Sequence, residues 1–260
     1  MKIKQYYNLD NIEKSYEILQ KKNSLVVGGG AFLHLGDREV ENAIDISNLG
    51  LDYIKNKQEY IEIGASTTLR EIEKSEILKN NFHGIVSKTV SKIMGVQIRN
   101  MATIGGTVFG RYGFSDLLTS LLSLDTTVEL YKNGKMSLEE FLESDIQKDI
   151  LTKIIIKKDG RCAKYLNMRN TSTDFSMLNV AVSRKDNEFK ISVGARPNRA
   201  KLCYEASNFM AKSNFNYEDA KQAGEIAANE LNFGKDIRAS KEYRKELCSV
   251  LVKRAILEVL

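Results

Sequence analysis

The chain has 260 residues, of which 42% are hydrophobic, so it is long enough to bury a core and to divide into two or three compact units. Its 39 basic residues nearly balance its 34 acidic ones, which leaves a net charge of +5 and argues against nucleic acid as a partner. Because the sequence shows no signal-peptide pattern and no apolar run of about 18 residues, we expect a cytoplasmic protein with no membrane partner.

The cysteines exclude two classes of site. Cys162, Cys203 and Cys248 are odd in number and far apart, so they form neither a paired disulfide framework nor a CxxC metal site. We expect all of them to be buried, reduced thiols.

The N-terminal part alternates helices and strands. Leu9, Ile12, Tyr16 and Leu19 share one helical face, and the apolar run SLVV that follows predicts a strand stopped by three glycines. Short strand-like runs, AIDIS and EYIEIGAS, come next, followed by two helices. The helical period then breaks at GVQIRNMATIGG, where we expect a glycine loop.

The middle of the chain carries clear helix starts. SDLLTSLLSL predicts a helix whose first amides are capped by Ser115 and Asp116. TTVELYKNGK predicts a strand that ends in an Asn-Gly turn. Ser137 and Glu140 stand at the spacing of a capping box, and DILTKIIIK predicts the strand after that helix.

The pattern changes at about residue 158, where we place a domain boundary. Two strands, FSMLNVAVS and EFKISVGA, are joined by the polar turn RKDN, and three amphipathic helices follow. In the last helix Tyr243, Leu247, Leu251 and Ala255 form one stripe, which we expect to pack on the sheet.

Two glycine-rich segments are candidate phosphate sites. In VVGGGAF, residues 26–32, a strand end opens into glycines whose backbone amides an anion can approach. Leu33 stands where a Rossmann fingerprint needs its third glycine. Residues 103–111 space two glycines like a P-loop, but Arg111 follows where a lysine is required, which excludes an NTPase.

Each glycine segment alone is equally compatible with a tight turn. Together, the two loops can hold the two phosphates of one long cofactor from opposite sides. Asp116 has two interpretations, as an acceptor for ribityl or ribose hydroxyls or as a helix cap. His34 follows the first loop, and we interpret it as a packed side chain rather than a covalent attachment to the cofactor.

Beyond these patterns, one long motif resembles a known family. QIRNMATIGGTVFGRYGFSDLLTSLLSLDTTVEL is similar to the QIRN-x-x-TIGG-N…DLLPALLALDA signature of the FAD-binding subunits of molybdenum hydroxylases, such as xanthine dehydrogenase and carbon monoxide dehydrogenase. VVGGGAFL is similar to the family's first FAD loop. SVGARPNRA and DIRASKEYRKELCSVLVKRAI resemble its C-terminal domain, so the resemblance covers essentially the whole chain.

The resemblance implies an α+β fold. An FAD-binding domain of the vanillyl-alcohol-oxidase (PCMH) type, made of two α/β subdomains, is followed by an α+β domain like the C-terminal domain of the CO dehydrogenase flavoprotein. The expected bounds are residues 1–55 and 56–157 for the two subdomains and residues 158–260 for the C-terminal domain.

The resemblance also implies the residues that bind FAD non-covalently, and it implies no catalytic acid or base and no metal ligand. The first loop wraps the diphosphate, the second segment completes the site, Asp116 holds FAD hydroxyls, and two apolar residues border the cofactor. The complete set is Val27, Gly28, Gly29, Gly30, Ala31, Phe32, Ala102, Thr103, Gly105, Gly106, Thr107, Phe109, Gly110, Asp116, Ile150 and Leu151.

The implied function is that of an oxidoreductase subunit that relays electrons. A large molybdopterin subunit hydroxylates the substrate, a small subunit carries [2Fe-2S] clusters, and FAD on this chain passes electrons to NAD or another acceptor. Two alternatives remain open: a structural subunit that binds flavin weakly or not at all, and a self-contained FAD oxidoreductase of the same fold.

The chain departs from the family pattern near the second segment. Thr107 replaces the usual asparagine, and GRYGFSD replaces a stretch of small residues and proline, which brings Arg111 and Tyr112 beside the expected flavin. Relatives often carry a lysine close to the isoalloxazine ring after the strand that begins with DIL, where this chain has AKYL, so we suggest Lys164 for that position.

Overall fold

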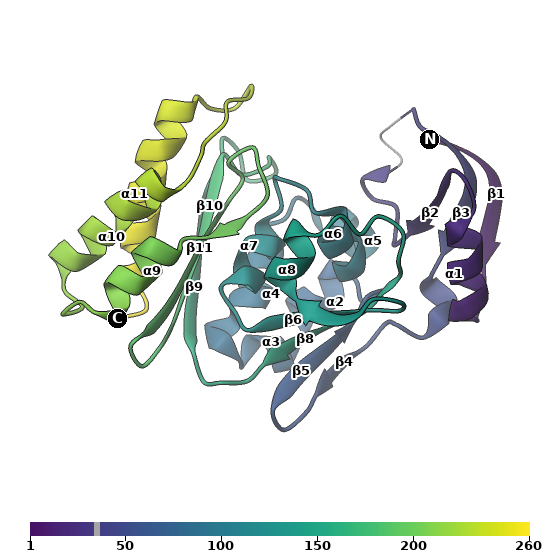
Figure 1. Cartoon of the computed structure of the whole chain (residues 1–260), viewed down its shortest axis with the longest axis horizontal. Helices are drawn as coiled ribbons and strands as arrows, with labels where there is room; N and C mark the ends of the chain where they lie inside the picture. The colour runs from purple at the N-terminus through teal and green to yellow at the C-terminus, as the bar shows by residue number, and fades with distance from the viewer. Residues whose placement is uncertain (34–36) are drawn as a thin grey trace. The chain divides into compact units, whose positions relative to one another are not determined.

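The computed structural model describes residues 1–33 and 37–260, so His34 lies outside the described residues. The described chain forms two compact units that alternate along the sequence (Figure 1). No helix among the described residues has the length and apolar character that crossing a membrane requires. Unit 1 comprises residues 1–72, 95–110 and 126–156, and unit 2 comprises residues 73–94, 111–125 and 157–260.

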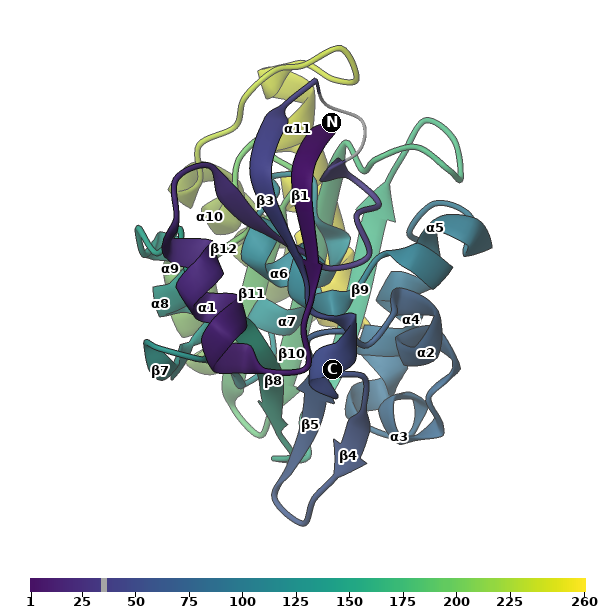
Figure 2. The ribbon, with the colours of Figure 1, turned by 90° about the vertical axis from the view of Figure 1, so that its right-hand side faces the viewer.

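Unit 1 begins with a small parallel sheet in the strand order β1-β3-β2. Helix α1 lies beside this sheet, as Figure 2 shows. Its first turn is capped by the side chain of Asn11, which accepts a hydrogen bond from the amide of Lys14. The elements are β1 (Lys2–Asn8), α1 (Ile12–Gln20), β2 (Ser24–Val27), β3 (Glu39–Asp45) and the short 3-10 helix η2 (Ser47–Leu49).

The second sheet of unit 1 has the order β4-β5-β8-β6-β7. The Asn-Gly turn between β6 and β7 and the capping box at Ser137 and Glu140 are both confirmed. The strands are β4 (Ile54–Asn56), β5 (Tyr60–Gly64), β6 (Thr126–Leu130), β7 (Gly134–Ser137) and β8 (Leu151–Lys157); the helices are α2 (Leu69–Lys74), which runs across the division between the units, α5 (Val96–Met101), α6 (Ile104–Gly110) and α8 (Leu138–Glu143).

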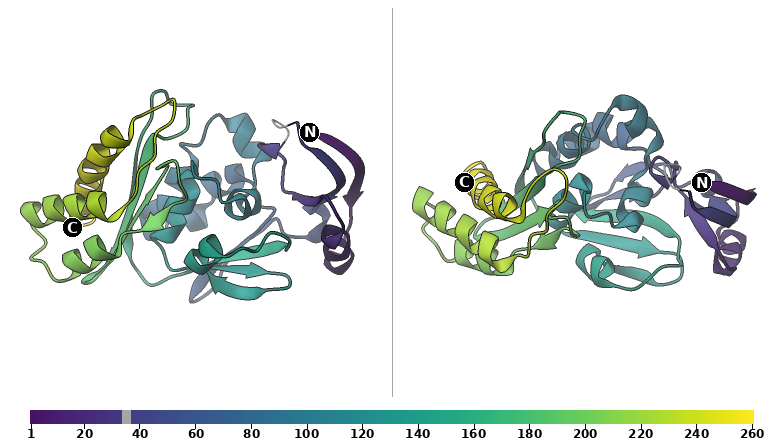
Figure 3. Two further views of the ribbon diagram at one scale, coloured as in Figure 1. Left: turned by 45° about the horizontal axis from the view of Figure 1, so that its top comes forward. Right: turned by 90° about the horizontal axis from the view of Figure 1, so that it is seen from above.

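Unit 2 is built around an antiparallel sheet in the order β12-β11-β10-β9. Helices α9 to α11 lie along one face, where they appear in green to yellow in Figure 3. The elements are α3 (Glu76–Lys79), η3 (Phe82–Gly84), α4 (Ile85–Val90), α7 (Asp116–Leu122), β9 (Cys162–Met168), β10 (Leu178–Lys185), β11 (Glu188–Gly194), β12 (Lys201–Leu202), α9 (Tyr204–Ala211), α10 (Tyr217–Glu230) and α11 (Lys241–Leu257).

Alternation along β10 gives its two faces different chemistry. Leu178, Val180 and Val182 belong to the apolar core that includes residues of α9 to α11. Asn179 points the other way, where its side-chain oxygen accepts a hydrogen bond of 2.7 Å from the hydroxyl of Thr119 in α7. The sheet of unit 2 therefore has an apolar face and a polar face.

Two expectations about unit 2 are wrong. Tyr243 is 47% exposed, because it lies in the first turn of α11; Leu247, Leu251 and Ala255, further along the helix, are buried as expected. The cysteines are not all buried either, since Cys162 at the start of β9 is partly exposed.

The close packing of α10 on α11 gives a stability prediction. A Cβ atom on Gly224 would lie 2.4 Å from the carbonyl oxygen of Ser249 in α11, so the two backbones approach too closely for a side chain. Gly224→Ala should therefore lower the unfolding free energy by about 1–3 kcal/mol, although alanine favours helices. Urea unfolding checks this against Gln222→Ala, an exposed position of the same helix expected to stay within about 0.5 kcal/mol of wild type.

Candidate functional site

The second glycine segment is helical, which corrects the expected loop. Helix α6 starts at Ile104, and its first amides already have acceptors in unit 1: the amide of Ile104 donates to the carbonyl of Thr67 at 3.0 Å and that of Gly105 to the carbonyl of Ala65 at 2.9 Å. Gly105 is required here, because a Cβ atom would lie 2.6 Å from the oxygen of Ala65. The neighbouring backbone thus converts the TIGG run into a helix start.

Thr103 joins the two glycine segments. Its side-chain hydroxyl donates to the carbonyl oxygen of Gly28 at 3.1 Å and accepts from the amide of Gly106, also at 3.1 Å. A Cβ atom on Gly28 would lie 2.8 Å from that hydroxyl, and one on Gly106 would lie 3.1 Å from the oxygen of Gly28. The two segments, 75 residues apart, therefore meet because neither carries a side chain at the contact.

The first segment retains free backbone donors. Gly29 and Gly30 have φ angles of 75° and 69°, in the left-handed region that favours glycine. Among the described residues, the amides of Gly28, Gly29 and Ala31 have no hydrogen-bond acceptor. Adjacent amides in such a turn form a concave donor surface that suits the oxygens of a diphosphate. We call residues 28–31 and 103–106 the glycine site.

The other expected residues of unit 1 lie in varied surroundings. Phe32 is 40% exposed, whereas Ile150 and Leu151 are buried at the start of β8. Phe109 packs against Phe141 of α8, with ring centroids 5.6 Å apart. Val27 ends β2, the carbonyl of Ala102 accepts from the amide of Leu69, the hydroxyl of Thr107 donates to the carbonyl of Thr103, and Gly110 ends α6.

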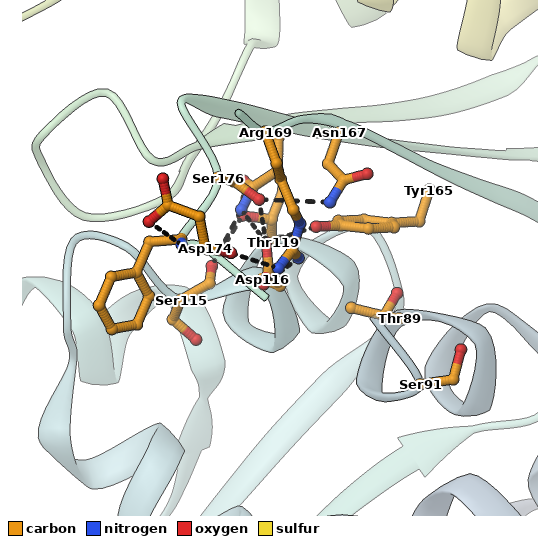
Figure 4. A network of polar contacts seen from close by, with 12 residues as sticks. Thr89, Ser91, Ser115, Asp116, Thr119, Tyr165, Asn167, Arg169, Asp174 and Ser176 are labelled. Atoms are coloured by element: carbon orange, nitrogen blue, oxygen red, sulfur yellow. Dashed lines mark hydrogen bonds and ion pairs between the residues drawn. The ribbon is translucent and has the colours of Figure 1, made fainter. Parts of the chain in front are cut away.

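Asp116, in unit 2, is a buried carboxylate whose oxygens already accept hydrogen bonds from four side chains (Figure 4). Arg169 forms an ion pair with one oxygen, Nη2 to Oδ2, at 2.6 Å. The other oxygen accepts from Tyr165 at 2.5 Å, from Ser176 at 2.6 Å and from Asn179 at 2.8 Å. A carboxylate oxygen has about two acceptor positions, so this chain saturates Oδ1 and pairs Oδ2 with Arg169.

The same network sets the protonation of Tyr165. Burial, and then the charge of Asp116, raise the pKa of its phenol well above the usual value. Tyr165 therefore stays neutral and remains a donor to the carboxylate. Asp116 also keeps the expected helix-start position, since Ser115 is the N-cap of α7 and accepts from the amide of Leu118.

Asp116 also fixes the turn between β9 and β10. Arg169, held by the carboxylate, donates through Nη1 to the carbonyl of Asp174 at 2.8 Å. The side chain of Asp174 in turn pairs with Arg238 at 3.0 Å. Phe175, next in the chain, packs its ring 4.2 Å from that of Phe114. The turn is thus held by charged and aromatic contacts within unit 2.

The segment that departs from the family pattern also packs within unit 2. Arg111 is buried and adopts a positive φ of 49°, and Tyr112 stacks on Phe114 with ring centroids 5.1 Å apart. Lys164, on β9, forms an ion pair of 2.6 Å with Glu258. These contacts give the side chains of Tyr112 and Lys164 a structural role.

No sequence pattern indicated the four partners of Asp116. They follow it by 49 to 63 residues and become neighbours only through the pairing of β9 with β10 and its packing on α7. The one sequence signal that could have revealed the ion pair is a spacing between Asp116 and Arg169 that recurs among relatives. Among the described residues, no group of three or more His, Cys, Asp or Glu side chains could hold a metal ion.

Two family models match consecutive parts of the chain. The model for the FAD binding domain in molybdopterin dehydrogenase matches residues 1–158, and the model for the CO dehydrogenase flavoprotein C-terminal domain matches residues 163–259. The expected order of an FAD-binding domain followed by a flavoprotein C-terminal domain is confirmed.

Similar proteins cover nearly the full length. The glyceraldehyde dehydrogenase medium chain of Sulfolobus acidocaldarius is 24% identical, over 98% of this chain and 97% of its own. The nicotine 6-hydroxylase medium subunit of Paenarthrobacter nicotinovorans is also 24% identical, over 97% and 96%. The structure of CO dehydrogenase from Oligotropha carboxidovorans superposes with a TM-score of 0.90 at 21% identity, covering 98% of this chain and 96% of that one.

The buried charge network predicts a difference between two substitutions. Asp116→Asn should destabilise the protein by about 3 kcal/mol, because it leaves the guanidinium of Arg169 buried without its counter-charge. Tyr165→Phe removes one of four donors and should cost about 1 kcal/mol. Urea unfolding measures both changes in stability. An Asp116→Asn protein as stable as wild type would contradict the role of Asp116 as the buried counter-charge of Arg169.

Proposed function

The chain belongs to the family of FAD-binding domains in molybdopterin dehydrogenases, and we propose that it binds FAD through the glycine site and relays electrons within a molybdenum hydroxylase complex. The observation that carries this proposal is the set of amides at Gly28, Gly29 and Ala31 that have no acceptor within residues 1–33 and 37–260, in a segment that Thr103 holds beside α6. Dinucleotide cofactors present a diphosphate, and such amides are its natural donors.

The residues present fit the cofactor. A side chain on Gly28 or Gly106 would fill the space around the hydroxyl of Thr103, so the sequence keeps this surface open. Because the amides of Ile104, Gly105 and Gly106 already donate within the chain, we assign diphosphate binding to the first segment. In this assignment α6 serves as the rigid support against which the first segment is held.

The cofactor would supply redox chemistry that side chains lack, since flavin exchanges electrons singly with one partner and in pairs with another. The residues of this chain bind and orient it. We propose that molybdopterin and the [2Fe-2S] clusters are carried by separate large and small subunits. We propose that the electrons pass from the flavin to NAD or another acceptor.

The organic substrate is not assigned to this chain. The two medium chains compared above are named for glyceraldehyde and for nicotine, although each matches this chain over nearly its full length. Medium chains similar to this one therefore occur in enzymes named for different substrates, which supports a substrate site on the molybdopterin subunit. Xanthine is one candidate among several.

One observation favours the alternative of a structural subunit with weak flavin binding. The first amides of α6 are all satisfied within the chain, so the second segment offers fewer donors than a loop would. Purified protein that stays colourless and cannot be loaded with FAD would support this alternative. Turnover of a small substrate by the isolated chain would instead support a self-contained oxidoreductase.

The glycine site predicts the effect of removing one hydroxyl. Thr103→Val keeps the side-chain shape but loses the link between Gly28 and Gly106, so the dissociation constant for FAD should rise about 10-fold or more. Flavin fluorescence during titration of the apoprotein measures it. Thr152→Val, which loses a comparable hydrogen bond of 2.9 Å to the carbonyl of Glu129, is the matched control and should bind FAD normally.

The outcomes of this experiment separate the proposals. Unchanged FAD affinity in Thr103→Val would contradict the glycine site while leaving FAD binding in place. An equal loss of affinity in both variants would show a general effect of destabilisation.

A further inference from the structure

Cys162 and His83 form a thiol–imidazole pair in unit 2, remote in sequence from every residue of the glycine site. The Sγ atom of Cys162 lies 3.3 Å from Nε2 of His83, although 79 residues separate them. Cys162 is the first residue of β9, an edge strand of its sheet, and is partly exposed; His83 is exposed. A nucleophile within hydrogen-bonding reach of a base, and open to solvent, is the arrangement that activates a thiol.

The backbone holds the imidazole in place at a conformational cost. Phe82, His83 and Gly84 have consecutive positive φ angles of 52°, 55° and 72°. Two of these residues are not glycine, so the turn is strained and must be fixed by its surroundings. The buried ring of Phe82 anchors it, and Nζ of Lys88 donates to the carbonyl of His83 at 2.7 Å.

The other two thiols have the opposite character. Cys203 and Cys248 are fully buried in the apolar core of unit 2. Burial raises the pKa of Cys248 to about 12 and that of Cys203 well above its usual value, so neither forms the reactive thiolate. Because neither reaches solvent, neither can resolve a disulfide formed at Cys162. A modification there would persist until an external thiol removed it.

We propose that Cys162 is a reactive thiol for which His83 is the base, and that small disulfides modify it. Nε2 accepts the thiol proton as Sγ attacks one sulfur of the disulfide. The disulfide bond of the reagent breaks, a new one forms to Cys162, and the other half leaves as a thiolate that takes a proton from solvent. Cys162 is oxidised and the departing half is reduced, so no further oxidant is needed.

The first test uses the unmodified full-length chain with dithiobis-nitrobenzoate, a disulfide that releases a coloured thiolate. One thiol per chain should react rapidly and two slowly, in proportion to their exposure. Peptide mass analysis should assign the rapid one to Cys162, and Cys162→Ser should abolish it. The proposal is overturned if the unmodified chain shows no rapid phase, or if the rapid phase is assigned to Cys203 or Cys248.

The second test isolates the base. His83→Asn suits the left-handed backbone, which asparagine tolerates, and should slow the rapid phase at least about 10-fold at neutral pH. Asp186→Asn makes the same kind of change at another residue of unit 2 with a positive φ, of 52°, and should leave the rate unchanged. Circular dichroism verifies folding of both. A folded His83→Asn protein that reacts at the wild-type rate overturns the role of His83.

Discussion

The hydroxyl of Thr103 is the point on which the candidate cofactor site depends. This oxygen donates to the carbonyl of Gly28 and accepts from the amide of Gly106, so it holds the end of β2 against the first turn of α6. Glycine is needed on both sides, because a Cβ atom on either would press on this contact. Within the part of the chain that the structure describes, the amides of Gly28, Gly29 and Ala31 lack an acceptor, whereas the first amides of α6 all donate within the chain.

Local sequence signals predicted local structure well. The capping box at Ser137 and the helix start at Ser115 each depend on a few neighbouring residues, and both are confirmed. The α+β class and the order of the two family domains followed from the long motif and are confirmed too. Features decided by distant residues were missed. The TIGG run is helical because the backbone near Ala65 accepts its amides, and no pattern within the run reveals that.

The surroundings of Asp116 are also set by residues distant in the sequence. Its place in the motif identified it as a polar contact for the cofactor, and that role stays a prediction. The structure shows a carboxylate that orders the turn after β9 through Arg169 and holds Tyr165 neutral. The partners come from a strand pairing that sequence spacing alone does not indicate. The exposure of Cys162 was missed for a similar reason, because a strand start and a distant turn meet only in the folded chain.

The alternation of the two units along the chain bears on synthesis at the ribosome. Unit 1 has all of its segments once residue 156 has emerged, yet α7, with four buried leucines, belongs to unit 2. The sheet that it packs on, starting at Cys162, has not been made at that moment. Helix α7 can then contact α4 but not this sheet, so it stays partly uncovered while the last hundred or so residues are added, a stage at which nascent chains aggregate readily. Fragments cut near residue 158 would carry that partly uncovered helix permanently.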